Sequence, residues 1–254
     1  GSVRIPGAMT GVVGLKPTAG LVSSFGVVRE ATAPSVDHVG ILARTVGDVA
    51  DVLAVIAGPD PSDAATLRVS AGPPPAEARA SDRTSLDGVR LGVFSEVTRE
   101  ALDELVEPEP DVVAVVNAAY EQLKDLGATL VPVDLPTLVR SSEAIFTLVS
   151  TELAAAHRWL LGPKRSSYHP AIASMLEHAL DVPPEQVLEA VEIRTTLRRE
   201  VEEAFSTSDV QMLVSPTTPR VAMPLDLFDP EEELLSLIHI SEPTRPRLIS
   251  YAVF

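Results

Sequence analysis

The histidine and cysteine side chains that most often build metal sites and catalytic triads are sparse in this sequence. Cysteine is absent, which excludes a thiolate metal site and a cysteine nucleophile. Four of the five histidines show no mutual spacing typical of a metal site or of a Ser-His-Asp triad, so we interpret them as surface or packing residues; they are His38, His157, His169 and His178, while His239 lies in the last twenty residues of the chain. The sequence therefore indicates neither a metal centre nor a cysteine nucleophile.

A specific pattern opens the chain, with a serine followed by an aliphatic residue, an arginine, any residue, a proline and a small residue. It reads Gly1-Ser2-Val3-Arg4-Ile5-Pro6-Gly7. Four further strings follow in order: Gly11-Val12-Val13-Gly14-Leu15-Lys16-Pro17-Thr18, then Gly26-Val27-Val28, then Val36-Asp37-His38-Val39-Gly40, then Ala43-Arg44-Thr45-Val46. Over about the first sixty residues, the order and spacing of these strings resemble the amidase signature family of serine hydrolases. A weaker likeness, to the family's late strand and loop, returns at Leu213–Pro219, and only the layout is similar in between.

The resemblance implies an acyl-transfer hydrolase with a Ser–cis-Ser–Lys triad, in which Ser2 is the nucleophile. A serine hydroxyl needs a base beside it, and in the family that base is a Lys acting through a second Ser. Both lie before this motif in family members, so we expect this chain to lack them. The backbone N–H groups of Gly1 and Ser2 would form part of the oxyanion hole. The resemblance implies no metal or organic cofactor.

Other residues near these motifs have structural interpretations. The family position that matches Lys16 is not the catalytic lysine, and Arg4 is expected to hold the motif loop rather than to touch substrate. Thr217 and Thr218 are candidates for lining the acyl pocket, although Pro216 and Pro219 are explained equally well by a rigid turn.

The resulting hypothesis is a parent enzyme that hydrolyses a carboxylic amide to an acid and ammonia or an amine, while the fragment itself is inactive. One alternative is the glutaminase A subunit of a tRNA-dependent amidotransferase. Members of that group tend to have Leu-Asp-Gln where this chain has Val36-Asp37-His38, which favours a stand-alone amidase. Two further hypotheses are a non-catalytic fragment, and a binding module in which Pro216–Pro219 is a ligand for an SH3-type domain.

The composition limits the classes of partner that this chain is expected to bind. The formal charge of −16 argues against nucleic acid or an anionic membrane as a partner. The lack of an 18-residue apolar run argues against a membrane span. We therefore expect a small-molecule amide substrate and a cytoplasmic protein, with the oligomeric state open, a homodimer included.

The periodicity predicts an α/β fold with a mixed central sheet between helices, incomplete at both ends. Residues 1–45 are expected to form loops and short strands, and a helix capped by Thr45 ends at Gly58-Pro59. A surface linker follows at about residues 59–85. We then expect a parallel crossover of strand 88–94, helix 111–126 and strand 129–133, followed by helices at 137–160 and 184–206 and a strand at 209–214.

The last twenty residues do not resemble the rest of the protein. Leu235–Arg245 and Ile249–Phe254 back-translate to the two ends of a transposase sequencing adapter. We therefore expect residues 1–234 to be a partial amidase-signature domain and residues 235–254 to be a non-native artefact tail.

Overall fold

The structure is a computed structural model of the 254-residue chain, and it describes residues 3–27, 33, 35–69, 85–222 and 224. The strands are β1 (Val13–Leu15), β2 (Ile41–Ala43), β3 (Arg90–Phe94), β4 (Thr129–Val133) and β5 (Met212–Val214). The helices are α1 (Arg4–Thr10), α2 (Val46–Ile56), α3 (Glu96–Leu105), α4 (Pro110–Asp125), α5 (Ser141–Leu161), α6 (Pro170–Leu180) and α7 (Pro184–Thr207). Short 3₁₀ turns lie at Thr66–Arg68, Pro136–Arg140 and Arg165–Ser167.

Strands β4, β3 and β5 form a parallel sheet in that spatial order. Leu91 of β3 pairs with Leu130 on one side and with Met212 on the other. Strand β3 therefore lies in the middle, and α4 belongs to the crossover that carries the chain from β3 to β4. The predicted strand–helix–strand unit is confirmed, and so is the α/β class.

The strands divide into two sheets in the described part of the chain, whereas a single mixed sheet was predicted. Strands β1 and β2 form a separate antiparallel pair in which Gly14 lies opposite Leu42. This pair packs on α2 around its own apolar cluster, which contains Leu15, Val49 and Leu53. Strands β1 and β2 form their ladder hydrogen bonds with each other there, and neither strand pairs with β3, β4 or β5 of the parallel sheet.

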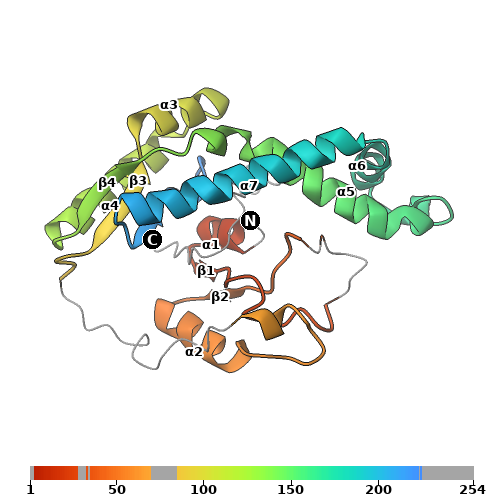
Figure 1. Ribbon diagram of the computed structural model, residues 1–254, viewed down its shortest axis with the longest axis horizontal. Coiled ribbons are helices and arrows are strands. Elements are labelled where there is room, and N and C mark those ends of the chain that lie inside the picture. Colours follow the sequence, from red (N-terminus) through yellow and green to blue (C-terminus); the bar gives the residue numbers. More distant parts are fainter. Residues whose placement is uncertain (1–2, 28–32, 34, 70–84, 223, 225–254) are drawn as a thin grey trace.

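Helix α7 connects the parallel sheet to a pair of helices (Figure 1). Its 24 residues span roughly 36 Å at 1.5 Å per residue. Towards its C-terminus, Leu197 and Val201 pack with Val133 of β4. Towards its N-terminus, Ala190 and Ile193 pack with residues of α5, which in turn packs against α6. Among the described helices, none is both long enough and apolar enough to cross a membrane.

Helix α1 corrects the expectation that residues 1–45 contain only loops and strands. Pro6 stands in its first turn, where a missing N–H costs nothing because that group would have no partner within the helix. Gly7 is buried inside the helix, and Gly11 ends it with a φ of 67°. Glycine inside a helix is usually unfavourable, so the sequence did not predict a helix here. A Cβ on Gly7 would lie 3.1 Å from the backbone nitrogen of Gly14, and the close packing of α1 on β1 therefore explains why residue 7 is a glycine.

Helix α2 begins as its sequence predicts. The Thr45 Oγ1 accepts a hydrogen bond from the backbone N–H of Asp48 at 3.1 Å, and the buried Val49 and Leu53 follow on one face. The predicted linker begins with an ordered turn, because Thr66 is 2% exposed and its hydroxyl contacts the backbone of Asp60. Residues 70–84 of that linker and all of the predicted tail lie outside the described residues.

Candidate active site

The predicted nucleophile Ser2 and its neighbour Gly1 lie outside the described residues, and Val3 is the first residue described. The Val3 carbonyl oxygen accepts a hydrogen bond from the Gly7 N–H at 3.0 Å, so the chain enters α1 immediately after Ser2. Arg4 is largely buried, and burial lowers the pKa of its guanidinium group. This placement agrees with a structural role for Arg4, although its function stays a prediction.

The loop before β2 is built around the fully buried Ala33. The backbone N–H groups of Val36 and Asp37 both donate to the Ala33 carbonyl oxygen, at 2.9 and 2.8 Å. The Asp37 carboxylate closes the turn by accepting from the Ala33 N–H at 2.7 Å. The string Val36-Asp37-His38-Val39-Gly40 is therefore a closed turn that leads into β2.

Three side chains tie this loop to the helices, and we call them the Ser35 clamp: Ser35, Glu152 of α5 and Arg194 of α7. The Ser35 N–H donates to Glu152 Oε2 at 2.8 Å, and its hydroxyl donates to Glu152 Oε1. Arg194 Nη1 donates to the Ser35 hydroxyl oxygen at 3.1 Å. The clamp fixes the loop before β2 relative to α5 and α7.

His38 is half-buried on this loop, where its Nδ1 lies 2.5 Å from the Val36 carbonyl oxygen. Because a carbonyl oxygen only accepts, Nδ1 carries the proton. Burial is the main cause that lowers the pKa of His38, and the nearby positive charge of Lys16 lowers it further. The hydrogen bond to Val36 and the charge of Asp37 oppose this shift without reversing it.

The lowered pKa of His38 predicts a loss of stability on acidification. The unfolded chain takes up a proton at a pKa of about 6.5, while the folded chain takes it up only at lower pH. The unfolding free energy should therefore fall as pH drops below about 6.5 and level off below the folded pKa. Urea unfolding of wild type and His38→Gln measured between pH 7 and 5 should give a flatter profile for the variant.

His169→Gln is the control for the loss of one imidazole, because His169 is exposed at the start of α6. The pH dependence of the unfolding free energy should differ between His169→Gln and His38→Gln. Equal profiles for wild type and His38→Gln would contradict the assignment.

Thr217 and Thr218 lie on the loop after β5, at the carboxyl end of the parallel sheet. The three strands end close together, because Phe94 pairs with Val133 and Val93 pairs with Val214. Ligands of open parallel sheets gather at this end. The location of the two threonines thus agrees with the sequence, and their contact with substrate stays a prediction.

This loop is held by contacts of its own. The Thr218 hydroxyl donates to the Arg220 carbonyl oxygen at 2.8 Å. Glu109, before α4, donates its N–H to the Pro219 carbonyl oxygen at 2.8 Å and accepts from the Val221 N–H at 3.0 Å. Thr218 therefore serves the turn, and of the two threonines Thr217 is the better candidate for facing a ligand.

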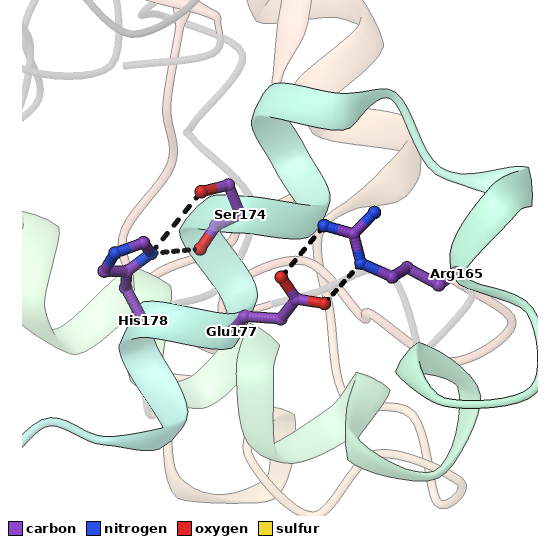
Figure 2. A network of polar contacts seen from close by, with 4 residues as sticks. All are labelled: Arg165, Ser174, Glu177 and His178. Carbon is purple, nitrogen blue, oxygen red and sulfur yellow. Dashed lines mark hydrogen bonds and ion pairs between the residues drawn. The ribbon is translucent and has the colours of Figure 1, made fainter.

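A histidine, a serine and a glutamate also lie together on α6, as Figure 2 shows. His178 Nδ1 lies 2.7 Å from the Ser174 carbonyl oxygen and 3.4 Å from its hydroxyl oxygen. A nitrogen that donates to the carbonyl cannot take a proton from the hydroxyl, so this pair is not a catalytic dyad. Glu177 instead pairs with Arg165 through two hydrogen bonds of 2.6 and 3.1 Å, which lower the pKa of the glutamate.

A cleft of about 340 Å³ lies between α5 and α6, beside His178. Its walls are mainly apolar, with Phe146 from α5 and Met175 from α6. In the part of the chain that the structure describes, no group of three or more His, Asp or Glu side chains is arranged to hold a metal ion. Asp60 and Asp63, in the ordered turn at the start of the predicted linker, instead accept hydrogen bonds from Ser23 and Ser24.

Several residues that shape this region were not singled out by the sequence. Gly14 and Gly40 pack against Val3, and their only sequence signal was their place in the matching strings. The Ser35 clamp had no signal, because its residues are separated by 117 and 159 positions. Contacts over such distances cannot be inferred from local patterns.

Known proteins resemble this chain in both sequence and fold. The family model described as Amidase matches residues 1–246. The chain is 34% identical to the A subunit of the glutamyl-tRNA(Gln) amidotransferase of Mycobacterium ulcerans, with 89% of this chain and 49% of that protein covered. It is 36% identical to an amidase of Pseudomonas putida, with 86% and 44% covered.

The chain thus spans about half the length of the curated relatives that it matches. Among solved structures, the fold is similar to that of the A subunit of glutamyl-tRNA(Gln) amidotransferase from Thermotoga maritima. That match has a TM-score of 0.69 at 24% identity, and it covers 94% of this chain and 49% of the other. The opening strings, the α/β fold and the match over residues 1–246 together establish that this chain belongs to the amidase signature family.

Proposed function

We propose that the parent protein, the whole protein that carries these residues, hydrolyses a carboxylic amide through an acyl-Ser2 intermediate. The observation that carries the proposal is the opening string Gly1–Gly7, whose serine stands at the position of the family's nucleophile. The chain leads directly from this serine through Val3 into α1, so the serine is attached to a packed part of the fold.

The reaction has two steps. The Ser2 hydroxyl oxygen attacks the amide carbonyl carbon, its proton passes to the leaving nitrogen, and the C–N bond breaks to release ammonia or an amine. Water then attacks the acyl ester, which releases the acid and restores the hydroxyl. By the family resemblance, a Lys acting through a second Ser moves these protons, and no residue of the present chain matches either group.

A second candidate is the glutaminase A subunit of a tRNA-dependent amidotransferase. Its support is the 34% identity to proteins of that name. In this reading the same acyl-serine chemistry acts on glutamine, and the activity depends on a partner protein. Val36-Asp37-His38, in place of Leu-Asp-Gln, favours the stand-alone amidase.

Trapping the acyl-enzyme tests the proposal. The parent protein is mixed with acetamide, benzamide or glutamine, quenched in acid and digested, and the peptide that contains Ser2 is analysed by mass spectrometry. We expect this peptide to gain the mass of the acyl group. Hydroxylamine added before the quench should remove the label as a hydroxamate, because it competes with water for the ester.

The 254-residue chain alone is the matched comparison. We expect no acyl group on its Ser2, since it contains no residue that matches the family's base. An acyl group on a different residue of the parent protein would reject the proposal. Turnover of glutamine that depends on an added partner protein would favour the amidotransferase hypothesis.

A further inference from the structure

Val3 is joined to Ser2 by one peptide bond and packs against two glycines from different strings. We infer that Gly14 and Gly40 are positioning residues that hold Val3, and through it Ser2, at the place where the nucleophile acts. The Cα atoms of adjacent residues are about 3.8 Å apart, so a displacement of Val3 is passed directly to Ser2. The inference rests on the proposed function, in which Ser2 is the nucleophile.

Gly14, in the middle of β1, faces the backbone of Val3. A Cβ placed on Gly14 would lie 2.6 Å from the Val3 carbonyl oxygen, 3.2 Å from the Val3 carbonyl carbon and 3.3 Å from the Arg4 Cα. These atoms are all backbone, and the Val3 oxygen is already fixed by the hydrogen bond from the Gly7 N–H. A side chain on Gly14 therefore cannot be accommodated by a change of rotamer.

Gly40, directly before β2, faces the side chain of Val3. A Cβ placed on Gly40 would lie 2.4 Å from Val3 Cγ2 and 2.9 Å from the Leu15 carbonyl oxygen. Valine has few χ1 rotamers, so its methyl groups cannot easily turn away. The two glycines thus limit Val3 in different ways, Gly14 through its backbone and Gly40 through its side chain.

Both glycines belong to well-fixed elements. Gly14 pairs with Leu42 in the β1–β2 pair, whose cluster includes Leu15 and Ile41. Gly40 ends the closed turn that the Ser35 clamp attaches to α5 and α7. Val3 therefore contacts one residue of the N-terminal β1–β2 pair and one residue of the turn that the Ser35 clamp attaches to α5 and α7.

The test measures how fast Ser2 of the parent protein reacts with a fluorophosphonate probe, in which the Ser2 oxygen displaces fluoride from phosphorus. In Gly40→Ala and in Gly14→Ala, we expect the maximal labelling rate to fall about 100-fold, the effect of a misplacement of about 1 Å. The probe concentration at half-maximal rate should change little, because the contacts that bind the probe are not altered.

A rescue experiment separates positioning from general destabilisation. Val3→Ala removes the methyl group that makes the shortest contact with a Cβ at position 40 and leaves the contact with the Leu15 carbonyl oxygen, so Val3→Ala/Gly40→Ala should recover part of the lost rate. Val3→Ala/Gly14→Ala should not recover, because the backbone of residue 3 is unchanged. Gly47→Ala is the matched neutral control, since its Cβ would approach only Thr45 Oγ1, at 3.7 Å.

Should the glycine variants fail to fold, Val3→Ala and Val3→Thr test the same contact from its other side. Val3→Thr preserves the branched shape and should label faster than Val3→Ala. Unchanged labelling rates in folded Gly14→Ala and Gly40→Ala, equal rescue of both double variants, or equal rates for the two Val3 variants would overturn the inference. A Ser2→Ala protein that still labels and turns over amide at the wild-type rate would instead remove the proposed function.

Discussion

A Ser2→Ala variant of the parent protein is expected to hydrolyse amides slower by on the order of 10⁶-fold, the cost of removing a serine nucleophile that acts as a unit with its base. Alanine has no oxygen to form the acyl ester, so only substrate binding and oxyanion stabilisation remain. The measurement is kcat for release of ammonia or amine at saturating substrate. The loss should appear in kcat, because the substrate-binding groups are left in place.

The matched control is Ser166→Ala, which removes the hydroxyl of an exposed serine on the 3₁₀ turn before α6. It should retain the wild-type kcat. Circular dichroism of both variants should match wild type, which assigns the loss in Ser2→Ala to chemistry rather than to folding. A Ser2→Ala protein with a kcat within tenfold of wild type would contradict the role of Ser2.

Leu197→Ala is expected to have the largest effect on stability, with a loss of about 2–5 kcal/mol in unfolding free energy. Leu197 is 1% exposed on α7 and belongs to the cluster that joins this helix to Val133 and Leu135, at the end of β4. Truncation removes apolar contacts and leaves a cavity between elements that cannot easily close. Urea unfolding followed by circular dichroism measures the change.

Leu188→Ala on the same helix is the matched control, because Leu188 is 64% exposed. Its unfolding free energy should change by no more than about 0.5 kcal/mol, as for other surface substitutions. The two variants remove the same atoms from the same helix and differ mainly in burial. Similar losses for both would contradict the role of burial at position 197, because the change from leucine to alanine does not lower helix propensity.

The local periodicity predicted much of the parallel unit. Strands β3 and β4 are apolar runs bounded by glycine and polar residues, and the amphipathic pattern between them gave α4 within one residue at each end. Helix α3 was not predicted, because its one buried side chain is Thr98, whose hydroxyl oxygen accepts a hydrogen bond from the Leu135 N–H. That packing depends on Leu135, which follows β4 and is far from α3 in the sequence, so no local pattern reveals it.

The sequence predicted which residues of the site could take part in the chemistry, but not the contacts that position them. Ser2, Thr217 and Thr218 were selected by motif, and the structure places the two threonines at the carboxyl end of the sheet. The roles of Gly14 and Gly40 come from contacts below 3 Å that a substituted Cβ would make, and such contacts require coordinates. The sequence identified both glycines as part of a motif without giving the reason for them.

The Ser35 clamp has a consequence for how the molecule opens. The cluster around Leu15 and Val49 shares no residue with the clusters around α5 and α7, and Ser35 is exposed where it joins the two. Exposed polar contacts contribute little free energy, whereas apolar clusters open as cooperative units. We therefore expect the N-terminal cluster to open as a separate cooperative unit, so that in a hydrogen-exchange measurement the backbone amides of β1 and β2 exchange before those of β3 and β4.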